Sequence, residues 1–421
     1  MNITSFIKEL FGWEIVVEQP FLFEINENQQ LGVPNLGNNF STDDNKNSCG
    51  AKKYGDSGST DPFVSNEKAS NFPATYNLIL LDESGSMRSV REEVVSGCNL
   101  LLQNISDLAH KIKEIKQYMS IFCFDTSHSR FIFQNVSGES IRDLTMADYY
   151  PNAYTPLYDA IGYTVTLLNK QLNNTKSVGM VTIITDGHEN ASHQWNHHMV
   201  VDIVERMKKK GWVFTFIGAI TDVETVATDL GINNFLKFEK TKEGMAAMFK
   251  EKKRSDLAFN AKRCYLERMH LAGSLTEEEC MEVYRKMNSN YFVPEERIAP
   301  DVIHKLGNDE IFVFGSNIQE QNDGSASPYT PKHFGASNGP TEEIRGNCYV
   351  IPIIGNTYDE LKKTIEHFNG FVATHPHKKF ILANIGYEIS EYSDEQIAPL
   401  FRLAYSFGNV YIPQIYLNYM K

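Results

Sequence analysis

The sequence lacks any signal for a membrane or for export. No stretch approaches the roughly 18 consecutive apolar side chains that a membrane-spanning helix needs. The first segment, residues 1–9, already carries Lys8 and Glu9 where a signal peptide would need an unbroken apolar core. We therefore expect no membrane association and a cytoplasmic location.

Paired cysteines and an excess of basic charge are also missing. The six cysteines are scattered and include no Cys-x-x-Cys pair, so no disulfide framework is expected. Cys98 and Cys123 stand among apolar residues, which is typical of small core side chains in a reducing compartment. With 40 Lys and Arg against 53 Asp and Glu, the net charge is −13. This charge argues against a protein whose main partner is nucleic acid.

What is present divides into five stretches. Residues 1–26 form an N-terminal segment. Residues 27–75 are expected to be a disordered linker, because they hold too few large apolar side chains to offset the entropy of folding; an exposed segment that binds a partner is the alternative. Residues 76–254 and 301–421 each have the pattern of an α/β domain. Residues 255–300, between them, are expected to be a helical connector.

The connector is predicted to contain two helices. Residues 261–271 have amphipathic spacing, and the stretch from Ser274 to Thr276 places a hydroxyl N-cap signal before a second helix that ends near Met287. We expect this helix pair to serve mainly as a spacer.

Short apolar runs alternate with amphipathic stretches between residues 76 and 254. Runs of this length suit strands buried on both faces, and the stretches between them have the spacing of helices. The alternation predicts a doubly wound α/β fold, a mostly parallel sheet with helices on both faces. The predicted strands are 78–81, 120–124, 180–185 and 212–217, the helices are 90–115, 157–172, 197–210 and 223–230, and 131–134 is expected to be an antiparallel edge strand.

Five polar residues in this domain are spaced like the ligands of a single magnesium ion. Asp82, Ser84 and Ser86 follow the first predicted strand, Thr155 lies in a separate loop, and Asp186 follows a later buried strand. Because the carboxyl ends of parallel strands meet at one edge of a sheet, these side chains are expected to converge. Hydroxyl, carboxylate and water oxygens are the ligands that Mg²⁺ prefers. The set leaves the ion short of one ligand, which a carboxylate from a partner protein can supply.

The pattern Asp-x-Ser-x-Ser, a distant Thr and a distant Asp-Gly resembles the metal-ion-dependent adhesion site of von Willebrand factor A domains. The resemblance covers the first α/β domain and is complete. It implies that Ser84, Ser86 and Thr155 bind Mg²⁺ or Mn²⁺ directly and that Asp82 and Asp186 act directly or through water. It also implies a protein-binding module rather than an enzyme, and no general base is evident beside the two carboxylates. By analogy, such a module would suit a bacterial or phage stress or conflict system.

Weaker candidates surround this set. Asp125 ends a predicted strand, where a turn and a supporting role at the metal site are equally open. Four histidines follow Asp186, and a solvated loop is favoured over zinc binding, which needs inward convergence and usually a Cys or carboxylate partner. Within this stretch His188 and Asn190 are candidate contacts for a partner. The four are His188, His193, His197 and His198.

Residues 301–421 restart the α/β alternation, and within them residues 308–415, approximately, resemble a bacterial and phage family related to macro domains. That resemblance implies ADP-ribose binding, with Gly315, Ser316 and Asn317 in a loop after the first strand, where backbone N–H groups can approach a phosphate. The matching stretches are 308–317, 333–336, 346–352 and 397–401. The predicted strands are 310–314, 348–353, 379–384 and 409–413, and the predicted helices are 358–371 and 394–407.

The alternative function is therefore ADP-ribose binding or ADP-ribosyl hydrolase activity, for which Asn317 and His333 are the best available residues. Two glycine-containing motifs of these relatives are replaced here, at 319–328 and 386–390. The replacements include acidic residues that would repel a diphosphate: Glu320, Asp323 and Glu388. We expect a macro-like fold with degraded ligand binding.

Overall fold

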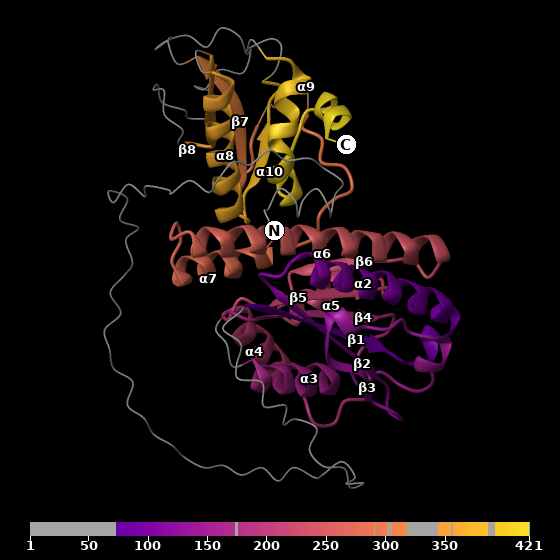
Figure 1. Cartoon of the computed structure of the whole chain (residues 1–421). Coiled ribbons are helices and arrows are strands. Elements are labelled where there is room, and N and C mark those ends of the chain that lie inside the picture. Colours follow the sequence, from indigo (N-terminus) through magenta and orange to yellow (C-terminus); the bar gives the residue numbers. More distant parts are fainter. Residues whose placement is uncertain are drawn as a thin grey trace.

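The computed structural model describes residues 73–172, 176–289, 291–300, 303, 305–317, 344–354, 357–385 and 392–420. These residues build two sheets with their helices, one above the other, and the long helix α6 (Lys242–Leu271) runs between them (Figure 1). The predicted N-terminal segment and linker lie outside the described residues, except for Pro73, Ala74 and Thr75, of which the last two already belong to strand β1.

The first sheet is mostly parallel, as predicted. Its order is β3-β2-β1-β4-β5-β6, and only β3 runs antiparallel, at the edge where the sequence placed such a strand. The strands are β1 (Ala74–Asp82), β2 (Lys116–Phe124), β3 (Arg130–Ser137), β4 (Val178–Thr185), β5 (Val213–Gly218) and β6 (Asn234–Lys237). Because β1 and β4 lie in the middle of the order, the residues that follow them share the central part of the carboxyl edge.

Helices cover both faces of this sheet, which confirms the doubly wound arrangement. Ile79 and Leu81 of β1 belong to the core that includes α2 and α6. Their neighbours Leu78 and Leu80 point to the opposite core, which includes α3, α4 and α5. The helices are α2 (Arg91–Lys111), α3 (Leu157–Gln171), α4 (His197–Lys208) and α5 (Val223–Asp229), with short 3₁₀ turns at Gly85–Val90, Gly138–Ser140 and Met146–Asp148.

Helix α6 differs from the expected spacer. It begins at Lys242 and continues without a break across the predicted boundary at residue 254. The ring of Phe249 fills the place that a Cβ on Gly97 of α2 would need, and Ala258 lies against Gly408 in the C-terminal part of the chain. Helix α6 therefore packs against both halves, and one hydrophobic core extends through it from the first sheet to the second. The division into domains itself stays a prediction.

The second helix of the predicted pair is confirmed. Helix α7 (Glu277–Lys286) begins at Thr276, whose hydroxyl accepts the N–H of Glu279, while the Glu279 side chain reaches back to the N–H of Thr276. This capping box is the hydroxyl signal seen in the sequence. A 3₁₀ turn, Met287–Ser289, follows it.

Polar side chains of α6 are buried together with the apolar ones. Arg263 is fully buried and donates to the Thr75 hydroxyl (2.6 Å) and to the carbonyl of Lys176 (3.0 Å), while its guanidinium lies over the Tyr284 ring. The buried Lys262 has its pKa lowered to about 7, because burial disfavours the charged form and Arg297 adds repulsion. Besides exposed charges, α6 thus carries several charged side chains inside the protein: Lys252, Asp256, Lys262, Arg263 and Glu267.

A second network on the same helix joins Lys252, Asp256 and Tyr291. Lys252 Nζ lies 2.6 Å from Asp256 Oδ1 and 2.7 Å from the Tyr291 hydroxyl, and that hydroxyl also donates to Asp256. Every member has a partner inside the network, as buried polar groups require.

The second sheet has the order β11-β10-β7-β9-β8, parallel except for β8. Its strands are β7 (Glu310–Asn317), β8 (Ile344–Arg345), β9 (Cys348–Ile354), β10 (Lys379–Leu382) and β11 (Val410–Tyr411), and its first helix is α8 (Tyr358–Thr374). The single helix predicted over 394–407 is instead α9 (Asp394–Ile397), a 3₁₀ turn (Ala398–Phe401) and α10 (Arg402–Ser406), because Pro399 cannot donate a backbone hydrogen bond within a helix. A 3₁₀ turn over Gln414–Tyr419 ends the described chain. The macro-like character of this unit stays a prediction.

Candidate metal centre

The loop that follows β1 is organised around Asp82. The Asp82 carboxylate is buried; its Oδ1 accepts the N–H of Ser84 (2.7 Å) and its Oδ2 accepts the hydroxyl of Thr185 (2.6 Å). Its backbone carbonyl accepts the Tyr149 hydroxyl (2.6 Å). The end of β1 is therefore fixed to the end of β4 and to the loop that leads to Thr155.

Backbone hydrogen bonds hold this loop beside the loop that carries Thr155. Asn152 donates its N–H to the carbonyl of Glu83 (2.7 Å), and Gly85 donates to the carbonyl of Ala153 (3.0 Å). A Cβ on Gly85 would lie 2.7 Å from the Asn152 carbonyl oxygen, so only glycine allows this close approach. The buried Glu83 carboxylate is paired with Arg130, and this pair also stabilises the junction of the two loops.

A chain of short contacts joins the two serines to Asp186. The Ser84 and Ser86 hydroxyls lie 3.0 Å apart, and Ser86 donates to Asp186 Oδ1 (2.5 Å). The Asp186 side chain has no solvent exposure, and its Oδ2 lies 2.5 Å from Lys240 Nζ. Oδ2 has no hydrogen-bond partner. The contact with Lys240 is therefore an ion pair that lacks the geometry of a hydrogen bond.

Thr155 is brought to the same place by Asn190. The Asn190 side chain accepts the N–H of Thr155 (2.9 Å), and the N–H of Asn190 donates to the Thr155 carbonyl (3.2 Å). A Cβ on Gly187 would lie 3.2 Å from the Thr155 hydroxyl and 3.9 Å from Asp82 Oδ2. Gly187 therefore lies against both groups, the Thr155 hydroxyl and the Asp82 carboxylate. All five predicted residues converge at the carboxyl edge of the first sheet.

Burial disfavours the negative charge of the Asp82 carboxylate. The pKa of Asp82 is raised to about 6, mainly because the group is buried. Hydrogen bonds from Thr185 and Ser84 oppose the rise, and the charge of Asp186 adds to it. A cation placed among these oxygens would offset the effect of burial, since a nearby positive charge favours the ionised form.

The weaker candidates have ordinary partners. Asp125 accepts the N–H groups of Ser127 and His128, so it forms a turn of its own loop rather than joining the cluster. His188 pairs with Asp222 at 3.3 Å. Within the residues that the structure describes, no three His, Cys, Asp or Glu side chains converge as a zinc site would require.

Three contributors to the cluster were not foreseen from the sequence. Thr185, the residue just before Asp186, fixes Asp82. Asn190, expected only as a contact for a partner, positions Thr155. Lys240 comes from the turn after β6, fifty-four positions beyond Asp186, and nothing in its surroundings in the sequence marks it.

The predicted phosphate loop of the second unit has a different backbone from the expected one. Gly315, Ser316 and Asn317 are not in a loop but continue strand β7, paired with β9. A Cβ on Gly315 would lie 2.3 Å from Ile353 Cδ1, so close packing between strands accounts for this glycine. The role of the three residues in ligand binding stays a prediction. His333 and the two stretches at 319–328 and 386–390 lie outside the described residues.

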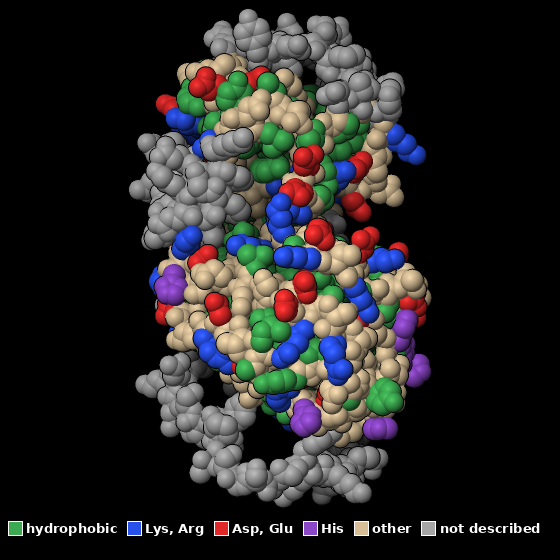
Figure 2. Space-filling model, turned by 90° about the vertical axis from the view of Figure 1, so that its right-hand side faces the viewer, with side chains coloured by type: hydrophobic (Ala, Val, Ile, Leu, Met, Phe, Trp, Pro, Cys, Tyr) green, Lys and Arg blue, Asp and Glu red, His purple; other side chains and the backbone are tan. Residues whose placement is uncertain are grey.

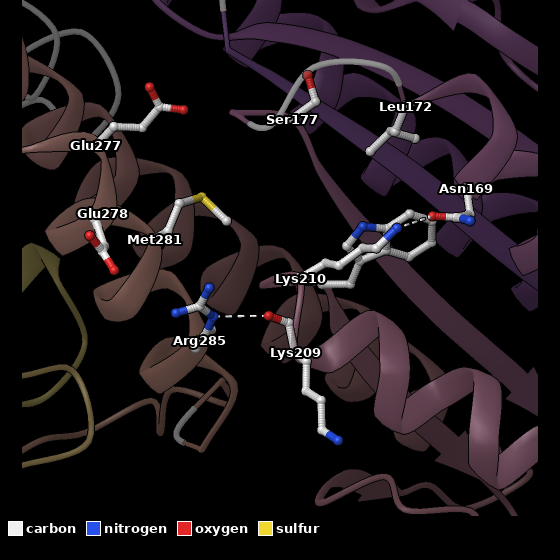
Figure 3. Close-up of a pocket in the computed structure, with 10 residues that line it drawn as sticks. Asn169, Leu172, Ser177, Lys209, Lys210, Glu277, Glu278, Met281 and Arg285 are labelled. Atoms are coloured by element: carbon white, nitrogen blue, oxygen red, sulfur yellow. Dashed lines mark hydrogen bonds between the residues drawn. The ribbon is translucent and has the colours of Figure 1, made fainter. Parts of the chain in front are cut away.

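A separate cavity of about 560 Å³ lies at the opposite end of the first sheet (Figure 3). It is lined by Ser177 and Trp212, which precede β4 and β5, and by side chains of α3 and α7. Lys210 Nζ donates to Asn169 (2.9 Å), so polar groups of its lining bind each other. The cavity has no part in the carboxylate and hydroxyl cluster.

Comparison with known proteins gives only distant likenesses. No model of a known protein family matches the chain, and no curated protein matches its sequence. Among the described residues, no helix is both long and apolar enough to cross a bilayer.

Similar solved structures include a von Willebrand factor type A protein from Catenulispora acidiphila (12% identity, TM-score 0.31) and the manganese-loaded TRAP protein of Plasmodium vivax (19%, 0.30). They cover 43% and 42% of this chain, and 42% and 72% of their own chains. The pilus adhesin SpaC from Lactobacillus rhamnosus GG is similar over 44% of this chain and 30% of its own (11%, 0.33). The chain thus spans less than half the length of the first of these structures. All these values are too low to transfer a function.

Proposed function

We propose that this protein is a metal-dependent protein-binding module of the von Willebrand factor A type, which captures a carboxylate of a partner protein through Mg²⁺ or Mn²⁺. The single observation that carries the proposal is the convergence of the five residues at one edge of the sheet. Three hydroxyls and two buried carboxylates come from three separate loops. Independent features of the fold, including Thr185 and Asn190, hold them there.

The donor set fits a hard divalent cation. All its groups are oxygens, which Mg²⁺ and Mn²⁺ prefer, and it contains neither the sulfur nor the imidazole that would favour zinc. Ser84, Ser86 and Thr155 would hold the ion with their hydroxyls, while Asp82 and Asp186 supply the negative charge. When bound, the ion would act as a Lewis acid with a coordination position left for an outside oxygen. The burial of the Asp82 carboxylate, which raises its pKa, supports a site that gains from a cation.

The surface around the cluster suits a partner protein. Three large side chains in the loop before Thr155 are exposed: Tyr154 by 68%, Tyr150 by 54% and Met146 by 37%. Arg91 lies over the Tyr150 ring. Figure 2 shows the side towards which the strands of the first sheet end, and Lys and Arg side chains, with some Asp and Glu among them, surround small hydrophobic patches there. Although the whole chain is acidic, this face thus offers basic and aromatic groups to an acidic partner.

The alternative, ADP-ribose binding or hydrolysis by the second unit, stays a prediction without an observation in its favour. Close packing explains Gly315 without a phosphate.

Thermal unfolding of the full chain with Mn²⁺, Mg²⁺ or EDTA tests the proposal. Wild type should gain about 2.7 kcal/mol of stability when the free ion is at 100 times its Kd. Asp82→Asn should show no such gain. Asp125→Asn is the matched control, because Asp125 lies at the same edge of the sheet but only caps a turn, and it should respond like wild type.

The partner is then sought by affinity capture with these three proteins. A genuine partner is retained by wild type and Asp125→Asn in Mg²⁺, and is lost in EDTA and with Asp82→Asn. An ion-independent melting temperature in wild type would refute the metal site. Partners retained equally in EDTA would refute the metal-dependent capture.

A further inference from the structure

A lysine is bound to the carboxylate that the proposed metal would need. Lys240 Nζ lies 2.5 Å from Asp186 Oδ2, while the other oxygen of Asp186 accepts the hydroxyl of Ser86. The carboxylate is therefore shared between a hydroxyl of the cluster and a cation of the protein itself. The Asp186 side chain is wholly buried, whereas the Lys240 side chain is 38% exposed.

A buried carboxylate without a counter-charge is strongly disfavoured, so Lys240 has a clear role when no ion is bound. A divalent ion at the same carboxylate would place two further positive charges beside the ammonium group. Like charges so close repel each other, so the ion and the lysine would compete for Asp186. The arrival of an ion would therefore weaken the contact between the lysine and the carboxylate.

The turn around Lys240 allows the side chain to leave while the backbone stays. Phe238 donates its N–H to the carbonyl of Gly218 (3.0 Å), and the Thr241 hydroxyl caps α6 by accepting the N–H of Gly244 (3.0 Å). A Cβ on Gly244 would lie 2.6 Å from the carbonyl oxygen of Glu239, so this turn is tightly packed. The lysine stem is long and flexible, and its ammonium is readily hydrated.

We propose that Lys240 is the built-in counter-ion of Asp186 in the metal-free protein, and that a divalent ion binds by displacing it. This inference rests on the proposed metal site. Lys240 acts as an internal competitor: it keeps the empty site folded and raises the ion concentration at which the site fills. It is a positioning and affinity-setting residue, and it is not a ligand of the ion.

Calorimetric titration of the full chain with Mn²⁺ tests this role. Lys240→Met should bind Mn²⁺ at least about fivefold more tightly than wild type, the change that corresponds to an ion pair worth on the order of 1 kcal/mol. Lys240→Arg keeps the cation and should stay near wild type. Lys242→Met removes the same charge from an exposed position two residues away and should change the affinity less than about twofold.

Thermal unfolding gives a second readout that does not depend on the affinity. In EDTA, Lys240→Met should unfold at a lower temperature than wild type, because Asp186 then lacks its counter-charge. Saturating Mn²⁺ should bring the two proteins to the same melting temperature. A merely structural lysine would lower both values equally.

Two outcomes overturn the inference, and they can be told apart. If wild type binds Mn²⁺ and Lys240→Met binds it equally or more weakly, the competition is refuted while the metal site stands. If no variant binds Mn²⁺ or Mg²⁺, the proposed function fails, and the role of Lys240 fails with it.

Discussion

Two regions of this protein bury charged side chains, and they differ in the partners that they give to the buried charges. Along α6, Arg263 donates to a hydroxyl and a carbonyl, so that only its Nε lacks a hydrogen-bond partner, and Lys252, Asp256 and Tyr291 satisfy one another. At the carboxyl edge of the first sheet, Asp186 has one oxygen without a hydrogen bond and relies there on a half-exposed lysine.

We interpret the paired groups of α6 as polar groups that stabilise the fold. We interpret the incompletely paired groups at the sheet edge as polar groups that can bind a ligand. A closed network such as that of Lys252, Asp256 and Tyr291 gains nothing from an added ion, because each member already has a partner. An incomplete network that the surrounding backbone holds in place gains stability when it binds an ion. The predictions below test whether the two regions really differ in this way.

The largest effect is expected from Arg263. Arg263→Ala leaves a buried hydroxyl and a buried carbonyl without their donor and opens a cavity beneath Tyr284, so it should cost roughly 3–4 kcal/mol of unfolding free energy. Urea unfolding measures the loss. Arg206→Ala, at an exposed position of α4, is the control and should change stability by less than about 0.5 kcal/mol.

The comparison also requires that Arg263→Ala leave the proposed metal site intact. The fraction of the variant that is folded should bind Mn²⁺ with the affinity of wild type. A variant that lost metal binding while it stayed folded would show that the two regions are not separate.

Replacing Lys262, whose charge is buried in α6, is expected to have a smaller effect on the free energy of unfolding, and of opposite sign. Its pKa in the folded protein, about 7, is below the value of roughly 10.4 in an unfolded chain. Between these values the unfolded chain holds more protons, so the stability of wild type should rise as the pH is raised from 7 to 9. Lys262→Met should be more stable than wild type at pH 7 by about 1–3 kcal/mol.

Urea unfolding at pH 7, 8 and 9 checks this prediction. The gap between wild type and Lys262→Met should narrow as the pH rises, because wild type loses its buried charge. A gap that is constant over this range would mean that packing, rather than charge, decides the effect of the substitution.

Much of the fold and the candidate cluster could be read from the sequence, and the reasons are physical. The strands of the first sheet are buried on both faces, so they appear as uninterrupted apolar runs such as the one that became β4. Asp82 and Asp186 follow two such runs directly, and topology alone brings the ends of neighbouring parallel strands together.

The rest depends on contacts that leave no local trace. Helix α6 carries many charged residues, which usually face solvent, and only the three-dimensional packing shows that Arg263 and Lys262 are inside. Lys240 follows β6, two strands away from β4 in the sheet, and yet its side chain reaches Asp186, a contact that no spacing in the sequence encodes. In the second unit, the sequence around Gly315 was compatible both with a ligand-binding loop and with the close strand packing that the structure shows.

The measurement that tests the central claim most directly is anomalous diffraction from crystals of the full chain grown with Mn²⁺. We expect one strong anomalous peak among the hydroxyls of Ser84, Ser86 and Thr155, about 2 Å from its nearest oxygens, with Lys240 turned away from Asp186. Crystals that bind no manganese there, with the lysine still seated on Asp186 at saturating ion, would contradict the account.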